Sequence, residues 1–179
     1  MRHSNIWSTV LLLGLVVSCQ DDKIRHYKVS KLEAPALRQA HGHSALRYTV
    51  PEGWQEEANP EGMRAAAFKM VDGNQTIEIT IVPLSGSAGG LFQNVNRWRG
   101  QVGLDPIRED ELTQQIKQID IAGTRASYID LGGPEQRILA VVLVRNDQTW
   151  FFKLQGPADL VERQKAAFEA FVRSVKYDA

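Results

Sequence analysis

Residues 136–144 read QRILAVVLV, a nearly continuous apolar run in the second half of the chain. Strands that face water on one side alternate apolar and polar residues, whereas strands covered on both faces are apolar throughout. The run therefore predicts a central strand of a sheet. The polar residues 146–148 (NDQ) predict a turn, and residues 149–154 (TWFFKL) predict the strand that follows it.

Three more strands are predicted before this one. Residues 46–50 (LRYTV) alternate and stop at a turn, PEGW, at 51–54. Residues 63–70 (MRAAAFKM) and 76–84 (TIEITIVPL) predict the second and third strands, and the Asp72-Gly73 pair between them is a hairpin signal. The isoleucines at 77, 79 and 81 share one face of the third strand. We expect an antiparallel meander with one face in water.

Two helical segments are predicted next. Residues 91–99 form a helix that ends near Gly103, with Leu91, Val95 and Trp98 on one face and Asn94, Arg97 and Gln101 on another. A second helical turn follows Pro106, because the acidic residues Glu109, Asp110 and Glu111 are favourable near a helix start.

The last third of the chain completes the fold. Residues 118–123 and 124–131 predict two strands around a glycine turn, and residues 156–159 (GPAD) begin a final helix. The apolar stripe of that helix consists of Leu160, Val161, Phe168, Phe171, Val172 and Val175. The order is three strands, two helices, about four strands and one helix. It predicts an α+β fold, an antiparallel β-sheet flanked by helices in a single domain.

The N-terminus predicts export and lipid anchoring. Residues 6–17 are mostly apolar but span only about 18 Å as a helix, too short to cross a bilayer comfortably and typical of a signal-peptide core. The exit, VVSC at 16–19, resembles a lipobox, and Cys19 is the only cysteine. We therefore predict a signal peptide at 1–18, a lipidated Cys19 with a tether over 19–44, and a folded domain over 45–179. Gln20 after the cysteine favours the outer membrane and the periplasmic face.

Composition limits the classes of function. About 160 residues remain after the signal, enough for one domain with a real core. The formal net charge is zero, which argues against a nucleic-acid binder. A single cysteine allows no disulfide within the chain.

The block after the glycine-rich loop is the most distinctive part of the sequence. Residues 89–104 read GGLFQNVNRWRGQVGL, and shorter blocks stand at 48–54 (YTVPEGW), at 63–64 (MR) and at 150–154 (WFFKL). Together they resemble uncharacterised lipoproteins of planctomycete and verrucomicrobial type, over most of residues 45–177. The order of elements is similar to the PsbP-like (Mog-type) α/β/α sandwich. This resemblance implies that fold and, because many members of that group are exported accessory or assembly proteins of membrane complexes, a similar role. It implies no catalytic residue.

Catalytic patterns are missing from the sequence. A nucleophile needs a base within reach, but no histidine lies inside the predicted fold and the only cysteine is the anchor. Residues 86–89 (GSAG) do not have the spacing of a nucleophile elbow. His41 and His43 could supply two metal ligands, fewer than a metal site needs, so we interpret them as surface residues. We predict no enzyme, no cofactor and no metal.

The loop at 85–90 (SGSAGG) and the helix after it leave two interpretations open. In one, the glycines form a close-packing turn, and Asn94, Asn96 and Arg97 make structural hydrogen bonds. In the other, Asn94, Arg97 and Arg99 contact a ligand or partner, because glycine amides and a helix start favour anions.

We therefore expect a lipid-anchored, non-enzymatic extracytoplasmic module that binds or assists a membrane protein complex. The alternative is a small-molecule or anion binder with its site near the Gly89-Gly90 turn and Arg97. A carboxylate enzyme using residues 109–111 is a third hypothesis.

Overall fold

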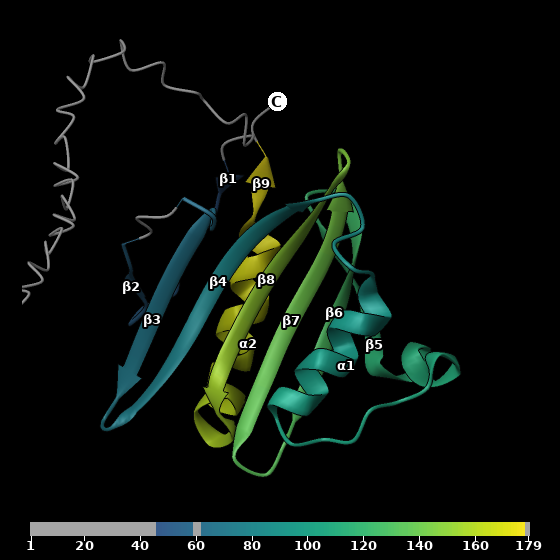
Figure 1. Ribbon diagram of the computed structural model, residues 1–179. Coiled ribbons are helices and arrows are strands. Elements are labelled where there is room, and N and C mark those ends of the chain that lie inside the picture. Colours follow the sequence, from purple (N-terminus) through teal and green to yellow (C-terminus); the bar gives the residue numbers. More distant parts are fainter. Residues whose placement is uncertain (1–45, 59–61, 178–179) are drawn as a thin grey trace, which may run out of the picture. The chain divides into compact units, whose positions relative to one another are not determined.

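A seven-stranded antiparallel sheet forms the centre of the computed structural model, which describes residues 46–58 and 62–177 (Figure 1). Across the sheet, the strands follow the order β2 (Gln55–Glu56), β3 (Ala66–Asp72), β4 (Gln75–Ser85), β8 (Gln148–Pro157), β7 (Gln136–Arg145), β6 (Thr124–Gly132) and β5 (Ile116–Ile121). β7 lies inside the sheet and is buried over Ile138–Leu143, so the prediction of a central strand is confirmed.

Tight turns join neighbouring strands where the sequence predicted them. Asp72 pairs with Gln75 across the two-residue turn between β3 and β4. Asn146 and Asp147 connect β7 to β8, both with positive φ (50° and 56°), as a two-residue hairpin turn of type I′ requires. The short polar side chains of Asn and Asp tolerate this backbone region better than most residues do.

A helix covers each face of the sheet. α2 (Ala158–Ser174) packs on one face, where Ile77, Ile79 and Ile81 of β4 are fully buried. Every residue of its predicted apolar stripe is buried. α1 (Leu91–Gln101) lies on the opposite face over β6 and β7, followed by a 3₁₀ segment, η1 (Glu109–Gln115), and Figure 1 shows the sheet between the two α-helices. The predicted α+β class, an antiparallel sheet with flanking helices, is confirmed.

The first predicted strand is wrong in length and partner. Only Leu46–Arg47 is a strand (β1), and it pairs with Lys176–Tyr177 (β9) rather than with the residues around Met63. Tyr48 instead turns inward, with its ring 5.8 Å from that of Phe68. The Thr49 amide donates a hydrogen bond to Ser174 Oγ at the end of α2. These contacts draw the segment across the end of α2, and β2 takes the edge of the sheet next to β3.

Several predictions lie outside the described residues: the signal peptide at 1–18, the tether at 19–44 with Cys19 and Gln20, and the histidines at 41 and 43. The described residues all belong to one compact unit. In this part of the chain, no helix has the length and apolar character needed to span a membrane.

Candidate functional site: a cationic pocket

The face of β4 and β8 that looks away from α2 changes from polar to apolar along the strands. Side chains on one face of a strand recur at every second residue, so cross-strand partners form rungs of a ladder. The rungs are, in order, Glu78 with Gln155, Thr80 with Lys153, Val82 with Phe151, and Leu84 with Thr149. α1 covers the neighbouring strands β6 and β7 and leaves much of this ladder open.

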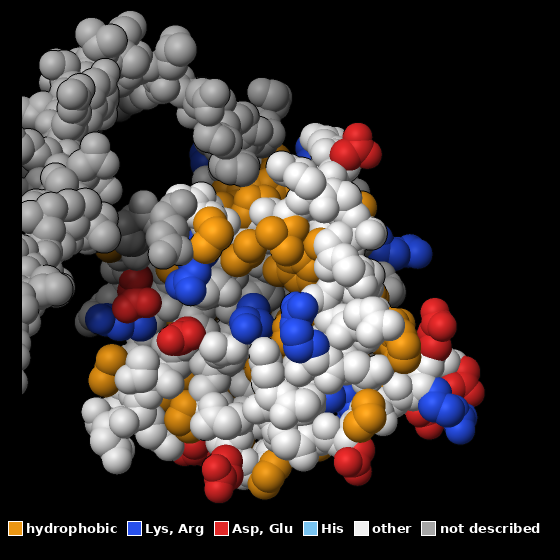
Figure 2. Space-filling model, viewed as in Figure 1, with side chains coloured by type: hydrophobic (Ala, Val, Ile, Leu, Met, Phe, Trp, Pro, Cys, Tyr) orange, Lys and Arg blue, Asp and Glu red, His pale blue; other side chains and the backbone are white. Residues whose placement is uncertain are grey.

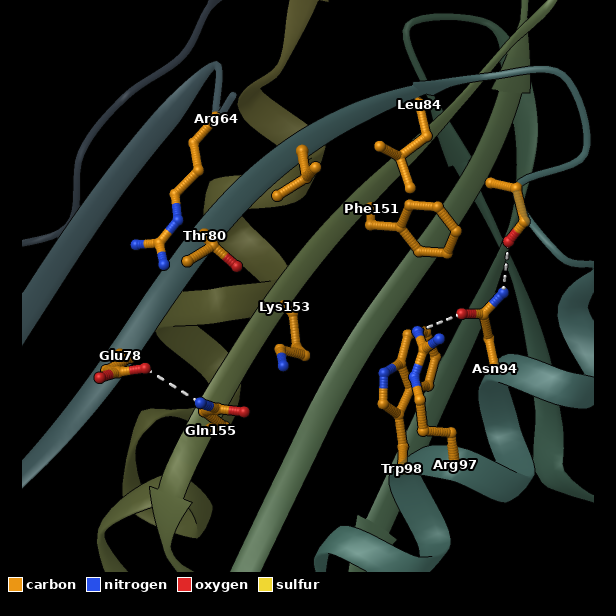
Figure 3. A pocket seen from close by; sticks show the side chains of 12 residues that line it. Arg64, Glu78, Thr80, Leu84, Asn94, Arg97, Trp98, Phe151, Lys153 and Gln155 are labelled. Atoms are coloured by element: carbon orange, nitrogen blue, oxygen red, sulfur yellow. Dashed lines mark hydrogen bonds between the residues drawn. The ribbon is translucent and has the colours of Figure 1, made fainter. Parts of the chain in front are cut away.

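A pocket of about 290 Å³ lies between this ladder and α1 (Figure 3). Its lining consists of Arg64, Glu78, Thr80, Val82, Leu84, Ala88, Asn94, Arg97, Trp98, Phe151, Lys153 and Gln155. We call it the cationic pocket, because its described lining holds two arginines and one lysine but one carboxylate. Figure 2 shows hydrophobic side chains gathered on this face beside lysine and arginine side chains.

Lys153 is at the centre of the pocket's charge. It is half-buried, and no hydrogen bond or ion pair engages its ammonium group within the described part of the chain. Burial lowers the pKa of Lys153, Glu78 partly opposes this, and the positive charges of Arg97 and Arg64 lower the pKa further. Arg97 and Arg64 are therefore close enough for their positive charges to destabilise the charged form of Lys153.

The carboxylate of Glu78 has a partner already. Gln155 Nε2 donates a hydrogen bond of 2.9 Å to Glu78 Oε2 (Figure 3). Glu78 and Gln155 both face solvent at the polar end of the ladder. At the opposite end, the described lining includes the apolar side chains of Val82, Leu84, Ala88 and Phe151.

Asn94 is held by hydrogen bonds within the fold. It is 3% exposed, and its Nδ2 donates to the carbonyl oxygens of Ala88 (3.0 Å) and Gly90 (2.7 Å). Its Oδ1 accepts a hydrogen bond from the Arg97 guanidinium. Both amide hydrogens are therefore used to hold the glycine-rich loop, and the carbonyl side of the amide orients Arg97.

The hydrogen bonds of the glycine turn lie within the loop and the start of α1. The Gly90 amide donates to Ser87 O (2.8 Å), and the Asn94 amide donates to Gly90 O. Gly89 and Gly90 have φ values of 81° and 77°, a region that glycine enters without strain. The close-packing interpretation of this loop is the one that fits its hydrogen bonds.

Arg99 lies apart from the pocket. Its side chain donates to Asp105 O (2.7 Å) and Gln115 Oε1 (3.1 Å), which ties α1 to the segment around η1. Asn96 makes a similar tie through two hydrogen bonds with the backbone of Ile107. Of the three residues predicted for a contact site, the structure brings Asn94 and Arg97 to the pocket and uses Arg99 elsewhere.

Sequence reasoning missed Lys153, Arg64 and Glu78. A signal for Lys153 was present, because it is the one charged residue in the strand TWFFKL, where buried side chains surround it. Its approach to Arg97 was not predictable, since it depends on where α1 lies on the sheet.

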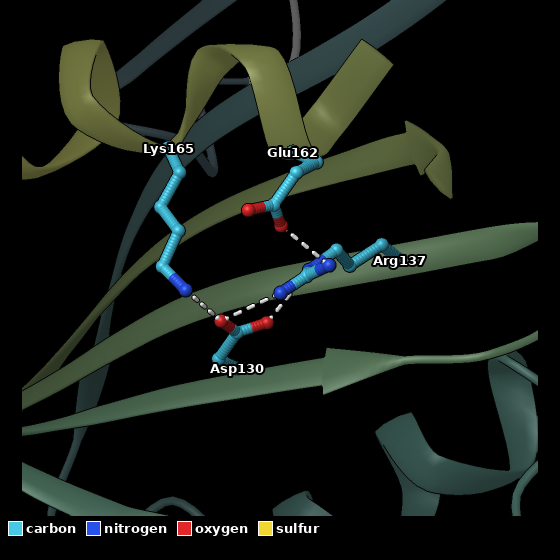
Figure 4. Close-up of polar contacts among 4 residues, drawn as sticks. All are labelled: Asp130, Arg137, Glu162 and Lys165. Carbon is cyan, nitrogen blue, oxygen red and sulfur yellow. Dashed lines mark hydrogen bonds and ion pairs between the residues drawn. The ribbon is translucent and has the colours of Figure 1, made fainter. Parts of the chain in front are cut away.

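Other clusters in the described residues are closed structural networks. Asp130 accepts hydrogen bonds from Arg137 (2.7 and 2.9 Å) and from Lys165 of α2, and Arg137 also pairs with Glu162 (Figure 4). The acidic run at 109–111 starts η1, where Glu111 accepts from the Arg108 amide and Asp110 pairs with the Arg108 side chain. Nowhere in 46–58 and 62–177 do three or more His, Cys, Asp or Glu side chains gather to hold a metal ion.

Comparison with known proteins gives fold neighbours but no family. No protein-family model matches the sequence, and no curated protein matches it. The solution structure of cyanobacterial PsbP (CyanoP) from Synechocystis sp. PCC 6803 is similar, with 15% identity and a TM-score of 0.44 over 77% of this chain and 95% of that one. PsbP is the fold that the sequence resemblance named.

Two other solved structures are similar to the same degree. PA94 of Pseudomonas aeruginosa, a protein of unknown function described as a putative regulator, has 13% identity and a TM-score of 0.41, over 75% of this chain and 98% of that one. A protein from Bacteroides thetaiotaomicron VPI-5482 has 11% identity and a TM-score of 0.41, over 75% of this chain. The match covers 46% of that longer protein. At these identities the likeness concerns the fold alone.

Proposed function

We propose that this chain is a lipid-anchored, non-enzymatic binding module outside the cytoplasm, and that its cationic pocket takes an organic anion. The observation that carries the proposal is the pocket itself, where Lys153 has no hydrogen-bond or ion-pair partner among the described residues, Arg97 lies close enough to act on its charge, and Gln155 already engages Glu78. A concave cationic surface concentrates anions, and hydrogen bonds to a charged partner are stronger than neutral ones.

A pocket beside Arg97 favours a small ligand over a flat protein contact. An accessory module beside a membrane complex would need an exposed contact face. The surface beside Arg97 is instead a concave pocket whose lining mixes cationic and apolar side chains. We therefore place anion binding ahead of the accessory role. A ligand-binding lipoprotein could still serve a membrane complex, with the ligand as its signal.

The pocket is tested by titrating the purified full chain with butyrate and, as a neutral match, butyramide, followed by NMR. Butyrate is expected to shift resonances of the pocket residues, and butyramide is not. Lys153→Gln should weaken butyrate binding by about tenfold or more, because a hydrogen bond to a charged group contributes about 1.5–3 kcal/mol.

The matched control is Lys117→Gln, which removes an exposed lysine from β5 at the opposite edge of the sheet. It should leave butyrate binding unchanged. Equal binding of butyrate and butyramide, or equal effects of the two lysine variants, would contradict the proposal.

The anchor is tested separately by Cys19→Ser in the native host. Loss of the acylated cysteine should move the chain from the membrane fraction to the soluble fraction or leave its signal uncleaved, because acyl chains provide the membrane affinity. Unchanged, cleaved and membrane-bound protein would rule out lipidation at Cys19.

A further inference from the structure

The cationic pocket has two chemically different ends. At one end is Lys153, with Arg97 and the guanidinium of Arg64 close enough for their charges to act on it; at the other are Val82, Leu84, Ala88 and Phe151 (Figure 3). The rungs of β4 and β8 fix this order, since Thr80 pairs with Lys153 and the next rung is Val82 with Phe151. A simple inorganic anion would use only the first end.

The apolar end is a rigid wall with one uncovered side chain. Phe151 packs edge-on against Trp98 of α1, with ring centroids 6.1 Å apart, and both side chains are almost fully buried. Leu84 at the far rung is 44% exposed, one of few large apolar side chains so open in the described residues. An apolar ligand chain lying along this rung would remove Leu84 from water.

The polar end admits only one direction for such a chain. Beyond Lys153 the surface continues into a depression lined by Thr76, Glu78, Gln101, Gln136 and Gln155, together with Arg137 and a few apolar residues. An apolar chain would gain little there, so it must run from Lys153 toward Leu84. Glu78 also stands at the charged end, and its charge disfavours a second negative charge on the ligand.

The length of the apolar end sets the length of the chain. Two rungs separate Lys153 from Leu84, roughly 14 Å at about 3.4 Å per strand residue. An extended chain covers roughly 1.2 Å per bond, from the 3.3–3.6 Å that three backbone bonds span. A chain of roughly twelve bonds therefore fits between them.

We infer that the ligand is a medium-length, unbranched monocarboxylate, with its carboxylate at Lys153 and Arg97 and its alkyl chain along Val82, Phe151 and Leu84. This inference rests on the proposed anion-binding function and specifies its substrate class. Binding is non-covalent: the carboxylate meets the cations, and the methylene groups displace water from the apolar wall.

The test is a chain-length series on the full chain by calorimetry. Butyrate, hexanoate, octanoate and decanoate are compared with the alcohols of the same lengths, each below its micelle concentration. From hexanoate to decanoate, affinity should rise about three- to fourfold per added methylene group, the factor that corresponds to about 0.8 kcal/mol per buried CH₂. Each alcohol should bind more weakly than its acid.

Two exposed apolar residues provide a matched pair of variants. Leu84→Asn should weaken decanoate binding by about tenfold and butyrate binding far less, because burial of a leucine contributes about 1.5–3 kcal/mol and only the longer chain reaches it. Val71→Asn alters an equally exposed residue on β3 that does not line the pocket, and should change neither. The apolar residues 6–17 are common to all variants, so any binding to them cancels.

The outcomes separate the two proposals. If butyrate binds through Lys153 but affinity does not rise with chain length, the anion site stands and the alkyl inference is overturned. If no acid binds, or if the alcohols bind as well as the acids, both proposals fall. Equal effects of Leu84→Asn and Val71→Asn on decanoate would also overturn the inference.

Discussion

At the scale of single residues, Asn94 and Arg97 lie three positions apart on α1 and have different roles, one in the fold and one at the pocket. Asn94 is buried and satisfies two backbone carbonyls of the loop before the helix. Arg97 is exposed at the pocket and donates to Asn94 Oδ1. A double substitution would therefore confuse a folding defect with a binding defect.

We predict that Asn94→Ala lowers the free energy of unfolding by about 1–3 kcal/mol, because it removes both side-chain hydrogen bonds to the loop and leaves Ala88 O without this donor. Arg97→Ala should cost less than Asn94→Ala, because it removes one hydrogen bond, to Asn94 Oδ1, beside an open pocket that water can enter. Urea denaturation of both variants measures the difference. If Arg97→Ala were as destabilising as Asn94→Ala, the division of roles would be wrong.

Tyr177 provides a second residue-scale prediction, on the pH dependence of stability. Its hydroxyl is buried and has no hydrogen-bond partner among the described residues, and burial raises the pKa of Tyr177 to about 12, against a lowering effect of Arg145. The unfolded chain loses this proton near pH 10, before the folded chain does, so stability falls as pH rises through the window from 10 to about 12.

In Tyr177→Phe this part of the pH dependence should disappear. At pH 7 the variant should be as stable as the wild type or slightly more stable, since it removes an unsatisfied buried hydroxyl. Thermal unfolding of both proteins from pH 7 to 11 checks the prediction; parallel curves would contradict it.

At the scale of elements, a charged network fastens α2 to the sheet. Asp130 of β6 accepts hydrogen bonds from Arg137 of β7 and Lys165 of α2. Burial by itself raises the pKa of Asp130, but the bonds from Arg137 and Lys165 outweigh it and hold the pKa below its ordinary value of 3.8. The stability that Asp130 contributes is therefore present above pH 3.8 and is lost as pH falls through its lowered pKa.

Asp130→Asn should lower the free energy of unfolding at pH 7 by about 1–3 kcal/mol, because three charge-assisted hydrogen bonds weaken. The difference from wild type should shrink as the pH is lowered to 2. Asp110→Asn is the control, since Asp110 and Arg108 form an exposed pair and its loss should change little. Denaturation of the wild type and both variants at several pH values tests this prediction. A stability difference between Asp130→Asn and wild type that persists at pH 2 would contradict it.

The elements themselves could mostly be predicted from local pattern. Alternation located β4, helical spacing located α1 and α2, and short polar turns located the hairpins. Leu46–Val50 was mispredicted because its alternation carries no information about partners, and its pairing with Lys176–Tyr177 joins residues from opposite ends of the domain. Arg97 was predicted from a loop motif, whereas Lys153 required the placement of α1 over the sheet.

At the scale of the whole molecule, the two faces of the sheet are unequal. The cluster under α2 includes Phe68, Phe152, Phe168 and Phe171, while α1 covers a smaller cluster and leaves the pocket beside it. The sheet order explains this, because β4 and β8 lie side by side although the chain between them contains α1, η1 and three strands. The local sequence patterns of β4 and β8 do not predict that these two strands pair.

Alanine variants of Phe151 and Phe152, which face opposite sides of the sheet, test this difference in burial between the two faces. Phe152→Ala should cost about 3–5 kcal/mol, because the ring is fully buried under α2 and leaves a cavity. Phe151→Ala should cost less, because that ring already borders an open pocket. Denaturation curves of the two variants measure this, and equal losses would contradict it.

The pairing of β1 with β9 has a practical consequence. Leu46 lies opposite Tyr177, so the two ends of the described domain are ladder neighbours. A short linker could join them, and new ends could be opened in the Gly73-Asn74 turn between β3 and β4. Such a circular permutant should keep the sheet and both helices while its N-terminus moves to the far end of the β3–β4 hairpin. The domain could then be attached to a surface in a second orientation.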